Sequence, residues 1–235
     1  MPRLSLVTLA FLLSVSAFSQ IRFSDAEVIL QSRHIWRGQK LGTAPAIEPA
    51  FTLSSTRFSF NIWASVTTNN SYSEIDLIPS YQFDEFKLTL FDYYNPVPGK
   101  RNGYLNLREG KSRHSVELAI DNYSVEKRRL KWMIGTFLLG DKNKLSGNPF
   151  YSTYIELKYS IAFLGMETQA FAGLTPFEGY YADRLAIVNA GISFGKQLKL
   201  SSKLMIPFRI LIGSNPHKNN HFLVFSTGII FSDLK

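Results

Sequence analysis

Hydrophobic and polar residues alternate along much of this chain, with a period of two over runs of about ten residues. In the run 151–161, Leu157 and Tyr159 fall on one face, while Glu156 and Lys158 fall on the other. In the run 112–122, apolar and charged residues separate in the same way. Such alternation predicts β-strands with one apolar and one polar face.

About twelve runs of this kind follow one another. The predicted strands are Ala26–Arg37, Ala46–Ser55, Arg57–Thr67, Tyr72–Gln82, Phe86–Asn95, Ser112–Asn122, Leu130–Leu139, Tyr151–Ile161, Gly165–Leu174, Leu185–Gly195, Lys203–Ile212 and Phe222–Phe231. Most reach the ~10 residues that a tilted membrane-spanning strand needs, about twice the length of an ordinary globular strand. Phe86–Asn95 leaves its orientation open, because Leu88 and Leu90 share a face with Asp92.

The predicted connections alternate in length. Tight turns or modest connections follow the even-numbered strands, whereas five of the six odd-numbered strands end in longer Gly/Pro/Asn-rich loops. These loops are Gly38–Pro45, Pro96–Lys111, Gly140–Pro149, Thr175–Arg184 and Gly213–His221, with 68–71 as the short exception. Short turns at one end and long loops at the other predict an all-β, antiparallel up-and-down transmembrane barrel.

Residues 1–19 have the features of a cleaved signal peptide. Arg3 precedes an apolar run, and Ala17 and Ser19 provide small residues before a cut ahead of Gln20. We therefore expect export, with residues 20–235 forming one outer-membrane barrel. The chain has no cysteine, so disulfides cannot hold it, while 14% of its residues are aromatic.

Several motifs resemble the TorF-type porins, a family of small Gram-negative outer-membrane barrels. They are SRHIWRG and PAIEPAF within 32–51, the Trp63-Ala64-Ser65 run, SYSEIDLIPSY at 71–81 and FDYYNP at 91–96, with later echoes at His114, Glu117 and 154–156. The similarity covers mainly residues 32–122. It implies an outer-membrane β-barrel with a channel function, and it supplies no substrate.

Charges in the middle of the strands are expected to face the lumen, because Arg or Lys facing lipid costs ~2–4 kcal/mol at the bilayer midplane. The expected inward residues are Arg33, Arg37, Glu74, Asp76, Glu117, Asp121, Lys131, Glu156, Lys158, Glu167, Lys203 and Arg209, six acidic and six basic. They either neutralise one another inside a closed structural barrel or line a path for small solutes. A soluble secreted β-protein is the remaining alternative.

A constriction is expected around the first strand. Arg33 and Arg37 are four residues apart and so point the same way, ~13 Å apart along a strand. The hypothesis is that Arg33 pairs with acidic residues of other strands, including Glu74, Asp76 or Glu117. Removing one member would then change ion preference more than it changes folding.

The outer loops are rich in basic residues. Lys100, Arg101, Arg108, Lys111 and Arg113 surround Glu109, and Lys142 and Lys144 accompany Asp141. Lipid headgroup phosphates or anionic solutes could attract these groups. Outer-membrane lipid and small solutes are the expected partners. Nucleic acid is not, despite a formal charge of +8, because the basic groups do not gather on one element.

Motifs for catalysis or cofactor binding are missing from the sequence. A barrel lipid hydrolase is an alternative from another class, and Ser112, His114 and Asn95 are its candidate residues. His217 and His221 stand four apart in a loop-like Asn/Pro context without a neighbouring acidic or cysteine ligand. We expect neither a metal nor a cofactor, and no enzymatic activity.

Overall fold

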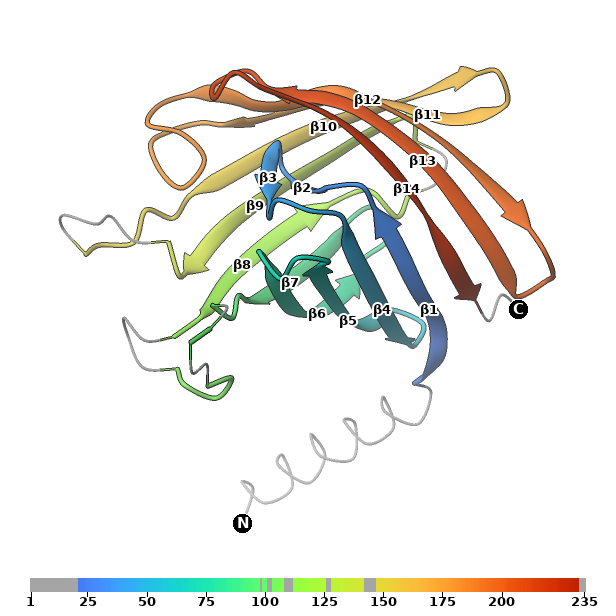
Figure 1. The fold of residues 1–235 in the computed structure, drawn as a ribbon, viewed down its shortest axis with the longest axis horizontal. Helices are drawn as coiled ribbons and strands as arrows, with labels where there is room; N and C mark the ends of the chain where they lie inside the picture. Colours follow the sequence, from blue (N-terminus) through green and yellow to red (C-terminus); the bar gives the residue numbers. More distant parts are fainter. Residues whose placement is uncertain are drawn as a thin grey trace, which may run out of the picture.

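Twelve antiparallel strands close into a barrel in the computed structural model (Figure 1). The structure describes residues 21–97, 99–100, 103–107, 112–125, 128–141 and 147–232. The predicted signal peptide lies outside these residues. Within them no residue is helical, and no helix long and apolar enough to cross a membrane is found.

Each barrel strand pairs with the next, and the last pairs with the first. The strands are β1 (Arg22–Gln31), β4 (Ala46–Ser54), β5 (Phe58–Thr67), β6 (Ser73–Gln82), β7 (Lys87–Tyr94), β8 (His114–Asp121), β9 (Leu130–Leu139), β10 (Thr153–Phe163), β11 (Met166–Thr175), β12 (Ala186–Lys199), β13 (Leu204–Asn215) and β14 (Asn220–Ser232). The predicted up-and-down barrel of about twelve strands is confirmed. Closure leaves no unpaired sheet edge.

The outer wall is apolar. Large hydrophobic side chains stand exposed on alternate positions of most strands, among them Val28, Leu30, Ile47, Phe51, Ile62, Ile75, Leu88, Leu90, Leu118, Ile134, Leu157, Tyr159, Ile187, Ile210, Ile212, Leu223, Phe225 and Ile229. The intervening positions bury polar and charged side chains, including Glu117, Asp121 and Glu156. This inversion of the usual globular pattern follows from the period of two that the sequence shows.

The structure also settles the orientation of β7. Leu88 and Leu90 are exposed on the outer wall, and Asp92 shares their face. Asp92 is accommodated there because its Oδ1 lies 2.8 Å from Nδ1 of His114, on the neighbouring strand. The carbonyl oxygen of Tyr104 lies 2.7 Å from the other ring nitrogen of His114.

The predicted first strand, Ala26–Arg37, is wrong in its second half. The barrel strand ends at Gln31, and the chain then forms a hairpin of β2 (His34–Trp36) and β3 (Gln39–Leu41) between the two sides of the barrel (Figure 1). Trp36 pairs with Gln39 across a two-residue turn in which Arg37 has φ +47° and Gly38 has φ +76°. Two left-handed residues are what a type I′ hairpin turn requires, and they end the extended run.

Gly38 also lets the hairpin approach the wall closely. A Cβ atom at Gly38 would lie 2.0 Å from the carbonyl oxygen of Val188 in β12. Glycine is therefore required at this position for two reasons, the positive φ angle and this close contact.

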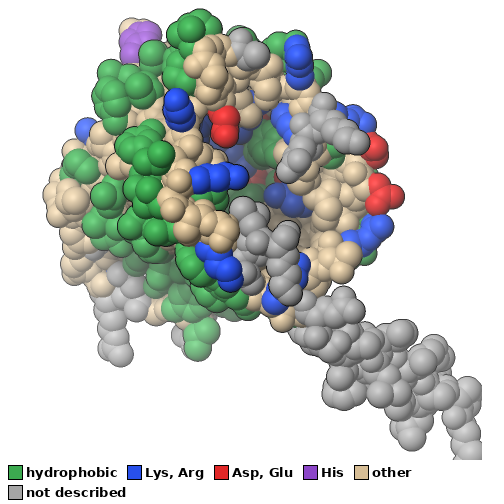
Figure 2. Space-filling model, turned by 90° about the vertical axis from the view of Figure 1, so that its right-hand side faces the viewer, with side chains coloured by type: hydrophobic (Ala, Val, Ile, Leu, Met, Phe, Trp, Pro, Cys, Tyr) green, Lys and Arg blue, Asp and Glu red, His purple; other side chains and the backbone are tan. Residues whose placement is uncertain are grey.

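One predicted long loop, Gly213–His221, is instead a tight turn, because pairing of β13 with β14 continues to Asn215 and Asn220. The other long connections lie at the opposite end from most of the short turns. Figure 2 shows the short-turn end, where Lys and Arg side chains surround a hollow and hydrophobic side chains cover the adjoining outer surface.

A charge on the outer wall should be costly at Leu157. This residue is half exposed near the middle of β10, between Trp132 and Ala172. We expect Leu157→Arg to lower the free energy of unfolding in lipid vesicles by ~2–4 kcal/mol. The neighbouring Lys158→Ala, on the lumen face, should cost less. A cysteine reporter that finds position 157 in water and position 158 in lipid would contradict the assignment of faces.

The Gly38 turn can be tested by proteolysis. Gly38→Ala should displace the hairpin, because a methyl group would collide with Val188, and trypsin should then cleave after Arg37. Gly165→Ala is the matched control, since Gly165 has φ +68° but open space around it. Gly165→Ala should lower the free energy of unfolding by only about 1 kcal/mol, the cost of an alanine in the left-handed conformation. Trypsin should not cleave after Arg37 in this control. Equal cleavage in both variants would argue against the close contact.

Candidate functional site

A buried ion pair fixes the hairpin inside the barrel. Nη1 of Arg37, at the hairpin tip, donates to Oε1 of Glu117 on β8 at 2.7 Å. The other carboxylate oxygen, Oε2, accepts the hydroxyl of Tyr93 at 2.6 Å. Arg37 also donates to the hydroxyl of Tyr181, in the loop between β11 and β12. Glu117 is fully buried, so these partners replace water around both of its oxygens.

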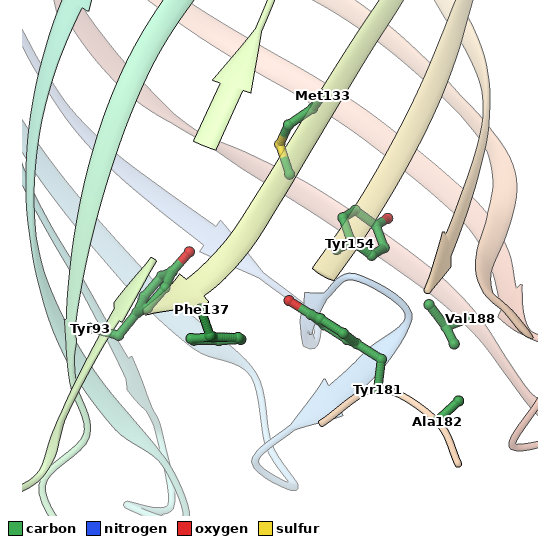
Figure 3. Packing of buried hydrophobic residues seen from close by; sticks show 7 residues of the cluster. All are labelled: Tyr93, Met133, Phe137, Tyr154, Tyr181, Ala182 and Val188. Carbon is green, nitrogen blue, oxygen red and sulfur yellow. The ribbon is translucent and has the colours of Figure 1, made fainter. Parts of the chain in front are cut away.

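Aromatic rings surround the same guanidinium group. The Arg37 Cζ atom lies 4.7 Å from the ring centroids of both Trp36 and Tyr154. Trp36 in turn packs against Phe137 and Tyr181, with centroid distances of 6.2 and 5.7 Å. Figure 3 shows the side chains of Phe137, Tyr154 and Tyr181 beside the hairpin. We call the hairpin and these aromatic residues the plug.

Two glycines in the barrel wall make room for the plug. A Cβ atom at Gly135 of β9 would lie 1.9 Å from Oε1 of Glu117. At Gly173 of β11 it would lie 2.1 Å from the hydroxyl oxygen of Tyr154. Small residues at these wall positions therefore allow large side chains to point inward from neighbouring strands.

The charge states within the plug are stable. Burial opposes the positive charge of Arg37, but Tyr181 and Glu117 outweigh it, and the pKa of Arg37 is raised well above its ordinary value. Burial raises the pKa of Tyr181 as well. Arg37 therefore stays charged and Tyr181 stays protonated at neutral pH.

A second carboxylate, Glu156 of β10, organises a neighbouring part of the lumen, two strands away from Glu117. It accepts the hydroxyl groups of Tyr123 and Tyr154, each at 2.6 Å, and the side-chain amide of Asn189 at 3.2 Å. Lys158 lies 2.9 Å away, and its Nζ is 4.2 Å from the centre of the Tyr123 ring. Tyr154 thus connects this network to Arg37 of the plug.

An acidic wall is formed by β4 and β6. Glu48 of β4 accepts from Gln31 and lies 2.7 Å from Nδ1 of His34, at the start of the hairpin. Glu74 of β6 accepts the Tyr72 hydroxyl at 2.7 Å. Both carboxylates are buried, and His34 joins them to the plug.

The plug and these two walls enclose a cavity of about 460 Å³ in the lumen. Its ionisable lining residues are His34, Arg37, Glu48, Glu74, Asp76, Glu156, Lys158 and Arg209. Asp76 Oδ1 and His34 Nε2 are buried and lack a hydrogen-bond partner among the described residues. The remaining lining is largely aromatic and aliphatic, including Trp63, Phe91 and Leu211.

The proposed pairing of Arg33 with Glu74, Asp76 or Glu117 is wrong. Arg33 follows the end of β1 and donates to the carbonyl oxygen of Gly42 at 2.7 Å, within its own connection. Arg37 takes the place expected for Arg33, because the chain turns inward after Gln31. Arg33 and Arg37 are therefore not two rungs on one barrel strand.

The other predicted residues divide between the cavity and the short-turn end. Glu74, Asp76, Glu156, Lys158 and Arg209 line the cavity. Asp121 accepts the backbone N–H of Tyr123 at 2.9 Å and lies 3.9 Å from Lys87. Lys131 donates to backbone carbonyl oxygens of the turn after β8. Glu167 is exposed near the start of β11, and Lys203 precedes β13. Of the predicted basic loop residues, Arg101, Arg108, Lys111, Lys142 and Lys144 lie outside the described residues, as does Glu109.

Sequence reasoning missed Glu48 and the aromatic residues of the plug. Glu48 lies between Ile47 and Pro49, and alternation in Ala46–Ser54 could have placed it inward. Alternation could have placed Tyr93 inward in the same way, because its neighbour Asp92 lies on the outward face of β7. Nothing in the local pattern around Tyr181 indicates that its loop returns into the lumen.

The candidate hydrolase residues do not form a catalytic set. The two ring nitrogens of His114 face Asp92 and the carbonyl of Tyr104, while Ser112 Oγ accepts the backbone N–H of His114 at 3.1 Å. Asn95 donates to Tyr72 instead. His114 is therefore not placed to activate Ser112. Among the described residues, no group of three His, Cys, Asp or Glu could hold a metal ion.

Comparisons with known proteins give similarity of fold at low identity. An outer-membrane channel from Pseudomonas putida F1 is 11% identical, with 89% of this chain and 94% of that chain covered and a TM-score of 0.44. Outer membrane phospholipase A from Escherichia coli is also 11% identical, with 94% and 97% covered and a TM-score of 0.40. A porin is 14% identical, with 80% and 62% covered and a TM-score of 0.34.

No family model and no curated protein matches the sequence. The resemblance to TorF-type porins therefore stays a prediction. All three structural similarities have TM-scores below 0.5. The function therefore has to be derived from the residues of this chain.

Proposed function

We propose that this protein is an outer-membrane channel for small solutes whose outer half is closed by the plug. The observation that supports this proposal is the charged cavity of about 460 Å³ beneath segments that belong to no barrel strand. A pocket of this size suits a small molecule. The loop between β11 and β12 and the β2–β3 hairpin would form the gate.

The membrane location is supported by the two faces of the wall. Exposed Leu, Ile, Val and Phe side chains cover the outside, while carboxylates such as Glu117 and Glu156 are buried inside. Such a surface is unfavourable in water and favourable in lipid, where the closed barrel satisfies its backbone hydrogen bonds. The signal-peptide features of residues 1–19 fit export.

The proposed gate is supported by the small size of the hairpin and by its dependence on a few contacts with the barrel. The hairpin has only three residues in each strand, which is too short to be stable alone. Its position depends on the Arg37–Glu117 pair, on the contact of His34 with Glu48 and on aromatic contacts with Trp36. Loss of one partner from a buried ion pair costs about 3–5 kcal/mol, so a local change could release the hairpin while the barrel persists.

The location is tested by fractionation. We expect the mature protein to begin near Gln20 and to sediment with the outer membrane after expression of the full chain. N-terminal sequencing and separation of the two membranes by density would measure this. Recovery of intact protein in the soluble periplasm would contradict the proposal.

The gate is tested by single-channel recording in planar bilayers. Wild-type protein should stay mostly closed. Arg37→Ala and Glu117→Gln should each shift the equilibrium between the closed and open states toward the open state by about a hundredfold or more, because either removes one partner of the buried pair.

Arg33→Ala is the matched control, since within the described parts of the chain Arg33 donates only to the carbonyl oxygen of Gly42, in the same connection. It should change the open probability much less than Arg37→Ala. Folding of each variant is checked by its heat-dependent electrophoretic mobility. Folded variants that never conduct would favour the closed structural barrel instead.

A further inference from the structure

We propose that the lumen cavity binds a small zwitterion, with its ammonium group at Asp76 and His34 and its carboxylate group at Arg209. This inference rests on the proposed channel function and assigns a solute class to the same cavity. All three residues line that cavity. Asp76 on β6 and Arg209 on β13 are five strands apart in one direction and seven in the other, so they lie on nearly opposite walls.

The acidic wall offers acceptors that nothing in the described chain uses. Asp76 Oδ1 is buried without a hydrogen-bond partner among the described residues, and so is Nε2 of His34. Because Nδ1 of His34 faces Glu48 at 2.7 Å, a proton on Nδ1 leaves Nε2 as an acceptor. An ammonium group has three donors and no acceptor, which matches two unused acceptors beside the carboxylate of Glu74. Glu74 interacts electrostatically with both His34 and Asp76.

The opposite wall offers a cation that is not consumed by a salt bridge. Lys158 pairs with Glu156 at 2.9 Å, whereas Arg209 forms no ion pair within the part of the chain that the structure describes. The guanidinium fork of Arg209 is suited to a carboxylate. An unpaired carboxylate and an unpaired guanidinium group facing one cavity favour a solute that carries both opposite charges.

Other ligand classes fit less well. The carboxylates of the acidic wall do not converge on a metal ion, since the described residues contain no metal-binding cluster. A solute with only a positive charge would meet Lys and Arg side chains around the hollow at the short-turn end (Figure 2). A zwitterion is neutral overall and avoids that repulsion.

The test is calorimetric titration of the folded, full-length mature barrel in detergent micelles. The ligands are glycine, 3-aminopropanoate, 4-aminobutanoate and 6-aminohexanoate, because this series varies the distance between the two charges. Ethylamine and propanoate are the singly charged controls. At least one zwitterion should bind about tenfold or more tightly than either control.

Asp76→Asn and Arg209→Gln should each weaken binding of the preferred zwitterion by about ten- to a hundredfold. Lys196→Gln is the control, since Lys196 pairs with Phe208 on the outer wall and should not affect binding. A ligand series that does not bind, or amines that bind as tightly as zwitterions, would overturn the inference. Conductance of the Arg37→Ala variant separates the two proposals, because a conducting barrel without zwitterion binding refutes only this inference.

Discussion

The contact between Arg37 and Glu117 holds the hairpin inside the barrel. Two charges at 2.7 Å inside a protein are favourable only if each is also satisfied by other groups. Glu117 accepts from Tyr93, and Arg37 donates to Tyr181 and lies over two aromatic rings. The pair therefore joins strand β8, the hairpin and the β11–β12 loop, three segments that are far apart in sequence.

The barrel wall makes this contact feasible. A strand that faces lipid on one side must place its polar residues on the other, so Glu117 has to point into the lumen. Gly135 on the next strand pairs with Ala119 but lies against the Glu117 carboxylate, so any larger side chain there would collide with it. The same rule orients Glu156 on β10. The period of two along the chain thus determines which polar groups can meet inside.

The alternation rule explains what sequence could predict. Long alternating strands such as β10 and β8 were identified with the correct faces, because burial on one side only fixes their register. The prediction that the first strand continues through Arg37 was wrong, although apolar and polar residues alternate along 26–37. Arg37 is left-handed and Gly38 lies close to Val188, which belongs to a distant strand. No local pattern of apolar and polar residues indicates such a contact. Tyr181 escaped prediction for the same reason.

A count of charges cannot reveal how they are arranged. Six acidic and six basic residues were expected to face the lumen, and balance suggested mutual neutralisation. The structure instead concentrates pairing at Arg37–Glu117 and Glu156–Lys158, while Asp76 and Arg209 stand on separate walls. A buried polar atom without a partner, such as Asp76 Oδ1, is costly to a folded protein. Asp76 lines the cavity, so a solute or water in that cavity has to supply the hydrogen bond that the described protein groups do not.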